Sequence, residues 1–382
     1  MIIINFFNTI YNLDRVNITE DYIENNPVGG WELMIYYLPL LFSKRKLNYK
    51  VFHFGYLWNN YYLLNTLIFQ YTEISQNFSK FFTDNVENII NFLNNFNNDI
   101  IINIFTLSHH DIDAFTPILE YLYNKENSIN IYSQQGFFKN NCNSNPKMYN
   151  NLKYFDYFFC ISEASFFNLK KINYSIIDKT FLTRNGFYSL KENKDIKVIN
   201  KNQLYFPSVN ERGYDFTKSI IEKINKKYNK KYYIYSFDYL YNKNALGKKD
   251  LYKKIKENFC SIYLPSKNEV ETFALSIKEN YYNKRPLILL PISGMNQYIS
   301  EYNKKTVLNT SKYLNLSIDI FDLIIPNEYW SDISNIFNSD LLVNDIFKIL
   351  EYLEDENNYQ EHCNNLGKLS DFFTLESLCD EW

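Results

Sequence analysis

The stretch SIYLPSKNEVETFALSIKENYYNKRPLILLPISG, residues 261–294, contains two short apolar runs on either side of a helix-length segment. Each run has the length of a buried strand, and residues 272–283 between them have helical spacing of apolar side chains. A strand, a helix and a second strand in this order predict a parallel sheet with a crossover helix. Two glutamates, Glu271 and Glu279, stand eight residues apart in this stretch. They are predicted to share one face of the helix, with Glu271 at its start.

The same alternation occurs along the whole chain. Apolar runs of strand length lie at 1–7, 49–55, 99–107, 128–136 and 154–162 in the first half, and at 204–208, 232–237, 260–266 and 286–292 in the second. Segments with helical spacing lie at 31–46, 214–228, 248–259 and 272–283, and from about 340 to the end. This alternation is typical of parallel sheets covered by helices, so the predicted fold class is α/β.

The length of the chain predicts two domains, because 382 residues are many for one hydrophobic core. The polar stretch 188–203 interrupts the apolar rhythm and is the expected linker. We therefore expect an N-terminal domain over 1–187 and a C-terminal domain over 204–365, each a Rossmann-like, doubly wound parallel sheet. Two such sheets joined by a short linker predict a ligand cleft between them, beyond the carboxyl ends of the strands.

The charge balance excludes one class of partner. Forty basic and 43 acidic residues give a net charge of -3, so no global field favours nucleic acid. The basic segments 42–50 and 223–233 leave weak peripheral membrane contact open, with solvated helix ends as the alternative. The five cysteines form no CxxC pair, which indicates neither a zinc site nor a disulfide framework and favours a cytoplasmic protein. No apolar run reaches the ~18 residues that a membrane span needs.

Glycines precede the first predicted helix. Gly29 and Gly30 would let a phosphate group approach backbone amides at a helix N-terminus. An ordinary tight turn before the helix is the alternative.

Histidines and glutamines follow the third and fourth predicted strands. His109 and His110 lie beside acidic residues and suit proton transfer or hydroxyl binding, although polar capping of the next helix explains this loop equally well. No metal is expected, because the other two histidines are far away in the sequence. Gln134 and Gln135 could bind a polar ligand or lie in a surface loop.

Two arginines stand next to turn residues. Asn185 and Gly186 predict a turn that leaves the side chain of Arg184 exposed. Arg212 and Gly213 precede a predicted helix, where an arginine could clamp a diphosphate by paired hydrogen bonds. A solvated charge before a helix is the alternative for Arg212.

Glu279 is predicted to lie on a mostly apolar helix face, where burial is costly without a partner. A ligand with hydroxyl groups, such as a ribose or a hexose, would supply that partner. The alternative is a solvated helix face, which the neighbouring Lys278 favours.

In this order, these residues resemble the retaining GT-B glycosyltransferases of family 4. The segments PS at 265–266, ETFA at 271–274, EN at 279–280 and RPLI at 285–288 are similar to the family's Pro-Ser, Glu-Gly-Phe-Gly, Glu-Ala and Gly-x-Pro-Val-Ile run. Upstream, VGG at 28–30, CISE at 160–163 and NG at 185–186 follow the family's order, and 366–382 resembles its last helix, which packs on the first domain.

The resemblance implies a GT-B fold and a hexosyltransferase that retains anomeric configuration without a metal ion or other cofactor. The donor would be a nucleotide sugar held by the second domain, and the acceptor would be a glycan, a lipid-linked molecule or a protein. By position, Glu279 would bind the ribose, and Arg212 would neutralise the departing diphosphate. The transferred sugar would be held by Glu271 and the amides of Thr272, Phe273 and Ala274. Gly29 and Gly30 would admit the diphosphate.

The sequence departs from the family pattern at two positions. Pro207 stands where the family has a phosphate-binding arginine, which Arg184 would replace. Gln134 or Gln135 stands where it has a histidine, which His109 or His110 would replace. These departures keep two alternatives open: a GT-B protein that binds a glycan or a partner without turnover, and a nucleotide-sugar epimerase.

Overall fold

The computed structural model describes residues 1–10, 19–29, 33–45, 49–59, 62–71, 78–83, 86–107, 112–134, 150–190, 200–236, 245–265, 275–291, 300, 302–313, 337–370 and 373–381. The chain forms two compact units. The first unit comprises Met1–Thr19, Trp31–Arg184 and Cys379–Trp382, and the second comprises Glu20–Gly30 and Asn185–Leu378. The chain therefore passes four times from one unit to the other, after Thr19, Gly30, Arg184 and Leu378.

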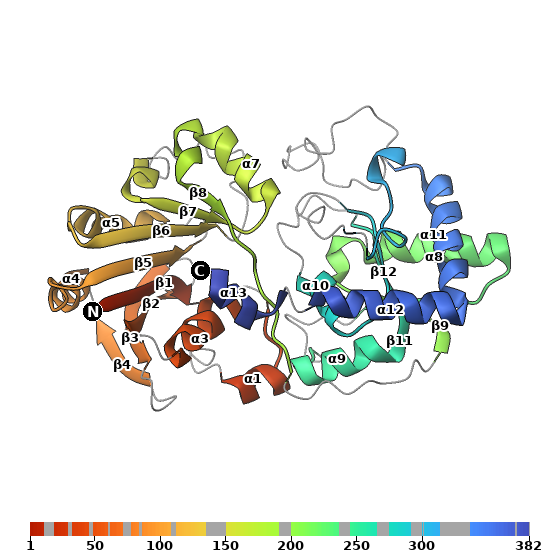
Figure 1. Ribbon diagram of the computed structural model, residues 1–382, viewed down its shortest axis with the longest axis horizontal. Helices are drawn as coiled ribbons and strands as arrows, with labels where there is room; N and C mark the ends of the chain where they lie inside the picture. The colour runs from red at the N-terminus through yellow and green to blue at the C-terminus, as the bar shows by residue number, and fades with distance from the viewer. Residues whose placement is uncertain are drawn as a thin grey trace. The chain divides into compact units, whose positions relative to one another are not determined.

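The first unit is built on one eight-stranded sheet with the strand order β4-β3-β2-β1-β5-β6-β7-β8 (Figure 1). Its parallel strands are β1 (Ile2–Ile10), β2 (Tyr49–Asn59), β5 (Ile100–Thr106), β6 (Ser128–Gln134), β7 (Tyr157–Cys160) and β8 (Thr180–Leu182). Two further strands, β3 (Tyr62–Tyr71) and β4 (Phe78–Thr83), pair antiparallel. The five predicted strands are confirmed, whereas β3, β4 and the short edge strand β8 were not predicted.

Helices cover both faces of this sheet. Helices α4 (Val86–Asn94) and α5 (Thr116–Tyr123) lie on one face, and α3 (Leu38–Lys44) lies on the other (Figure 1). A π-helical turn, Leu33–Tyr37, leads into α3, which carries a proline in its first turn, where proline is tolerated. Helix α7 (Glu163–Ile172) follows β7 and begins with Ser162, whose side chain accepts a hydrogen bond from the Ser165 amide as an N-cap.

The face under α4 and α5 combines an aromatic row with a polar row. Phe7 stacks on Phe54 and on Phe105, with ring centroids 4.6 and 4.4 Å apart. Next to this row, Asn5, Asn103 and Asn130 lie in register on β1, β5 and β6. The Asn5 amide donates to Asn103 Oδ1 at 2.8 Å, and the Asn103 amide donates to Asn130 Oδ1 at 2.9 Å. This buried asparagine ladder ties three neighbouring strands together.

The second unit contains a four-stranded parallel sheet with the order β10-β9-β11-β12. Its strands are β9 (Asn200–Phe206), β10 (Tyr233–Ser236), β11 (Asn258–Tyr263) and β12 (Leu287–Leu289). All four were predicted. Residues 200–203, which we expected in a linker, instead begin β9, because Asn200 pairs with Asn258 of β11.

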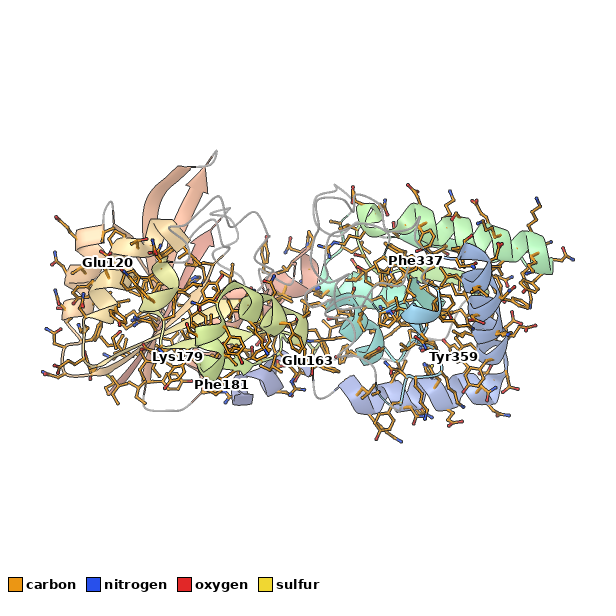
Figure 2. All side chains as sticks on the ribbon, turned by 90° about the horizontal axis from the view of Figure 1, so that it is seen from above. Glu120, Glu163, Lys179, Phe181, Phe337 and Tyr359 are labelled. Atoms are coloured by element: carbon orange, nitrogen blue, oxygen red, sulfur yellow. The ribbon has the colours of Figure 1, made fainter. Side chains whose placement is uncertain are left out.

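The helices of the second unit follow the predicted alternation. They are α8 (Tyr214–Tyr228), α9 (Lys248–Glu257), α10 (Leu275–Tyr282), α11 (Ser339–Glu354) and α12 (Glu356–Ser370). Tyr359 of α12 stacks on Phe259 of β11 with ring centroids 5.1 Å apart, so α12 covers one face of the sheet (Figure 2). Both units are therefore Rossmann-like α/β structures, as predicted. None of the described helices combines the length and apolarity that crossing a membrane requires.

Two short helices do not belong to the unit that the sequence predicted for them. Helix α1 (Glu20–Asn25) belongs to the second unit, although the strands before and after it in sequence belong to the first. The family resemblance implied that 366–382 returns to the first domain. Helix α13 (Leu375–Glu381) instead divides. The Leu375 amide donates to Phe187 O and the Phe187 amide donates to Phe373 O, both within the second unit, and only Cys379–Trp382 group with the first.

Candidate functional site

Strand β9 of the second unit leads directly to the predicted arginine turn. The strand ends at Phe206, and a short 3-10 turn, Asn210–Arg212, precedes Gly213 and α8. Gly213 has φ 133° and ψ 16°, a conformation that strains any residue with a Cβ. The turn thus requires the glycine, and Arg212 is half-buried beside it.

The start of α8 is fixed to the neighbouring strand. The hydroxyl of Thr217, in the first turn of α8, donates to Gly213 O at 2.9 Å and lies 3.4 Å from Leu264 O, just after β11. The carboxyl ends of β9 and β11 therefore meet at the N-terminus of α8. This 15-residue helix presents backbone amides and a positive dipole end to that edge of the sheet, which suits an anionic group.

Several predicted residues lie outside the described part of the chain. They are Gly30, His109, His110, Gln135, Glu271, Thr272, Phe273 and Ala274. The described chain after β11 ends at Pro265 and resumes with α10 at Leu275.

Glu279 is described, in the second turn of α10, and only 4% of its surface is exposed. We expected a ligand to supply the partner that its burial requires. The structure supplies one from the protein: Lys248 Nζ lies 2.5 Å from Glu279 Oε1, and the lysine is buried to the same degree. Because this lysine is the first residue of α9, the ion pair joins α9 to α10.

The surroundings of the ion pair are also polar. The Tyr252 hydroxyl donates to the backbone oxygen of Tyr188 at 2.6 Å. Burial, followed by the nearby Glu279 charge, raises the pKa of Tyr252 well above its usual value. Tyr252 therefore stays protonated beside the carboxylate.

The solvated face that Lys278 suggested for α10 is wrong. Residues Ser276, Ile277, Lys278, Glu279, Asn280 and Tyr281 are all buried. The Lys278 ammonium donates to the backbone oxygen of Asn185 and lies 4.9 Å from the centre of the Phe373 ring. A carbonyl and an aromatic face thus replace the water that a lysine usually keeps.

The glycine loop and Arg184 belong to different units. Gly29 is buried in the second unit, in the segment that follows α1. Arg184 is the last residue of the first unit, is half-buried, and has its pKa lowered by burial. Asn185 and Gly186 begin the longer segment of the second unit. Gly186 packs there against Leu375, since a Cβ at Gly186 would lie 2.5 Å from Leu375 Cα.

Gln134 is the last residue of β6 and is buried, so both of our expectations for it, a ligand contact and a surface loop, are wrong. It is 1% exposed, its amide lies 3.4 Å from Asn168 Oδ1, and its oxygen accepts from Cys160 Sγ at 3.3 Å. Both polar groups of its side chain therefore have partners within the first unit.

A metal centre has no support in the described part of the chain, where no three His, Cys, Asp or Glu side chains come together. Two buried histidines are described there. Burial lowers the pKa of His53 to about 3, and burial with the charge of Lys305 lowers the pKa of His362 to about 4. His53 lies 2.8 Å from the Asn8 side chain, and His362 lies 3.4 Å from the Thr306 hydroxyl, so both are neutral core residues.

Comparison with known proteins defines the fold. The sequence matches no protein-family model and no curated protein. Among solved structures, sucrose-phosphate synthase from Thermosynechococcus elongatus is similar with a TM-score of 0.56 and 10% identity, over 99% of this chain and 96% of that one. A mutant of TarM of S. aureus, solved with fondaparinux, alpha-GlcNAc-glycerol and UDP, is similar with a TM-score of 0.52 and 14% identity, over 85% of this chain.

This chain spans 62% of the length of that TarM chain. The similar structures are GT-B glycosyltransferases, and the two α/β units of this protein have the GT-B fold.

Proposed function

We propose that this protein is a glycosyltransferase that transfers a sugar from a nucleotide-sugar donor to an acceptor. The observation that carries the proposal is Glu279, a buried and ion-paired carboxylate on the helix after β11, at the position that the family resemblance assigns to ribose binding. The GT-B fold and the Arg212 turn at the start of α8 support the same donor site.

The proposed division of labour follows the chemistry of the donor. Glu279 accepts hydrogen bonds from the ribose hydroxyls. Arg212 and the α8 amides stabilise negative charge on the departing diphosphate, the main electrostatic task in this reaction. Glu271 and the amides of 272–274 hold the sugar, and Gly29 and Gly30 leave room for the diphosphate.

The finer assignments rest on the resemblance alone. They are transfer of a hexose with retention of configuration, no metal ion or other cofactor, and His109 and Arg184 as replacements for missing family residues. The acceptor is a glycan, a lipid-linked molecule or a protein, and the protein acts in the cytoplasm, with or without peripheral membrane contact.

A thermal-shift and calorimetry screen with UDP, GDP and ADP tests the donor site, because a ligand of the folded state raises its melting temperature. The expected result is binding of one nucleotide, weakened about tenfold or more by Glu279→Gln, which removes a hydrogen bond to a charged group. Glu222→Gln, an exposed glutamate on α8, is the matched control and should bind normally. If none of the nucleotides binds, or if Glu279→Gln binds as tightly as the parent, the donor-site assignment is wrong.

A binding protein without turnover is the second candidate. One observation that favours it is Pro207, which is buried at the end of β9 and offers no cation. The other is Gln134, whose side chain is buried and hydrogen-bonded within the first unit. An assay of nucleotide-sugar hydrolysis over a panel of donors separates the two, since measurable release of the nucleotide excludes the second candidate.

A further inference from the structure

We propose that Lys248 is a positioning residue for Glu279: its ammonium group holds the carboxylate in one orientation, ready to accept from the ribose of the bound nucleotide. This inference rests on the proposed function. Lys248 itself does not touch the donor. It acts through the carboxylate that does.

The geometry of the pair is the first argument. Lys248 Nζ lies 2.5 Å from Glu279 Oε1, with side-chain exposures of 4% and 5%. Burying a carboxylate to this degree is costly without a cation beside it. A carboxylate offers two oxygens as acceptors, which is what a pair of ribose hydroxyls requires. Contact at Oε1 also fixes Oε2, because the carboxylate is planar.

The anchoring of Lys248 is the second argument. The N-cap residue of its helix is Gly247, whose backbone oxygen accepts from the Leu251 amide at 2.9 Å. Gly247 packs against α1, so that a Cβ there would lie 2.4 Å from the Asn25 carbonyl carbon. Tyr188, which accepts from Tyr252 of the same helix, donates to Glu24 of α1 at 3.1 Å. The lysine therefore projects from a helix start that is held on two sides.

The same contacts connect the start of α9 to the helix that precedes Gly29 in the sequence. Helix α1 leads directly to Gly29, and α1, α9 and α10 all belong to the second unit. The cation that fixes Glu279 therefore projects from a helix whose start packs on α1.

The competing explanation is that the ion pair only stabilises the fold. The two explanations differ in whether loss of Lys248 changes how well the protein discriminates between nucleotides with and without ribose hydroxyls. The probes are UDP and 2′,3′-dideoxy-UDP, which lacks both ribose hydroxyls. The quantity is the ratio of their dissociation constants, measured by calorimetry for the parent, Glu279→Gln, Lys248→Gln and Lys248→Arg. A general loss of stability weakens both probes together and leaves this ratio unchanged.

The parent should bind UDP about tenfold or more tightly than the dideoxy probe, the size expected for hydrogen bonds to a charged group. The ratio should fall towards one in Glu279→Gln and in Lys248→Gln, and Lys248→Arg, which keeps the cation, should retain most of it. A folded Lys248→Gln variant with the parental ratio would overturn the inference. If Lys248→Gln does not fold, Lys248→Arg decides: loss of the ratio there, with the cation still present, would overturn it as well.

The outcomes also separate this inference from the proposed function. If the parent binds neither UDP nor any other nucleoside diphosphate, the donor site itself is wrong. If the parent and Lys248→Gln discriminate equally while Glu279→Gln does not, the donor site stands and Lys248 has no positioning role.

Discussion

Gly247 packs directly on the backbone of Asn25: a Cβ at Gly247 would lie 2.4 Å from the Asn25 carbonyl carbon and 2.6 Å from Glu24 O. Backbone atoms cannot move aside as a flexible side chain can. This contact joins the start of α9 to α1, two elements that are far apart in the sequence. It explains why α1, which comes between two strands of the first unit in the sequence, belongs to the second unit.

Gly247→Ala should destabilise the second unit by about 1–3 kcal/mol, the usual cost of forcing extra atoms into a packed site. Gly367→Ala is the matched control. Its Cβ would meet only the end of the Lys284 side chain, at 3.2 Å, and alanine favours the α12 helix by up to about 1 kcal/mol. Urea unfolding of both variants measures the difference. Equal stabilities would show that the α1–α9 contact can relax.

Removal of one member of the buried ion pair should be costly. Lys248→Met leaves Glu279 buried without its cation and should lower the free energy of unfolding by about 3–5 kcal/mol. The double variant Lys248→Met/Glu279→Gln removes both charges and should recover to within about 1 kcal/mol of the parent. A double-mutant cycle from urea unfolding checks this. Additive losses would mean that the two side chains do not interact in solution.

The asparagine ladder should be sensitive at its centre. Asn103→Ala removes the acceptor of Asn5 and one donor to Asn130, and leaving the buried Asn5 amide unsatisfied should cost about 2 kcal/mol. Asn91→Ala, at an exposed position of α4, should stay within about 0.5 kcal/mol of the parent. Chemical denaturation monitored by circular dichroism compares the two variants, and a loss that is similar for both would contradict a structural role for the ladder.

Stability should fall as the pH is lowered from 7.5 to 5.5. Because burial holds the pKa of His53 at about 3 and that of His362 at about 4, both are neutral in the folded protein over this range. The unfolded chain binds a proton at each histidine below about pH 6.5, so acid favours unfolding. The loss at pH 5.5 should be roughly 1.4 kcal/mol for each histidine, in the unit that contains it.

The variant His53→Gln isolates one of these contributions. Its first unit should lose less stability between pH 7.5 and 5.5 than that of the parent, while the second unit should be unaffected. Urea midpoints at the two pH values measure this. A parent protein that is equally stable at both would rule out neutral buried histidines.

The described cysteines should be inert in the native protein. Cys160, Cys260, Cys363 and Cys379 are all buried. Burial raises the pKa of the Cys160 and Cys260 thiols far above their usual range and that of Cys363 to about 11. Since the thiolate is the reactive form, brief iodoacetamide treatment at pH 8 should label at most one of the five thiols, and all five in guanidinium. Intact mass spectrometry counts the labels, and two labels on the native protein would contradict the prediction.

The parallel strands could be predicted because their sequences are short, mostly apolar runs. β5 and β11 are of this kind, since strands buried on both faces need few polar residues. The same criterion missed β3 and β4. They pair antiparallel with a neighbour in sequence, whereas the predicted pattern required a helix between consecutive strands.

The partners of charged side chains could not be predicted. The cost of burying Glu279 indicated that it needs a partner, but only the fold shows that Lys248, 31 residues earlier, is that partner. Lysines are ordinarily exposed, so Lys278 indicated that its face of α10 is exposed to solvent. Its burial depends on Asn185 and Phe373, which come from two distant segments. Of the predicted donor residues, the sequence located Arg212 and Glu279 on the correct turn and helix, because the strand–loop–helix pattern fixes both.

The four passages of the chain between its units limit how such a protein can be recombined. A gene segment encoding residues 185–378 carries Lys248 and Glu279 but omits α1, so the start of α9 would lack the backbone on which Gly247 rests. A chimaera made by a single crossover near Arg184 would set α1 from one parent against α9 from the other. Transfer of a complete second unit between proteins of this architecture therefore requires two separate inserts, residues 20–30 and residues 185–378, inherited together.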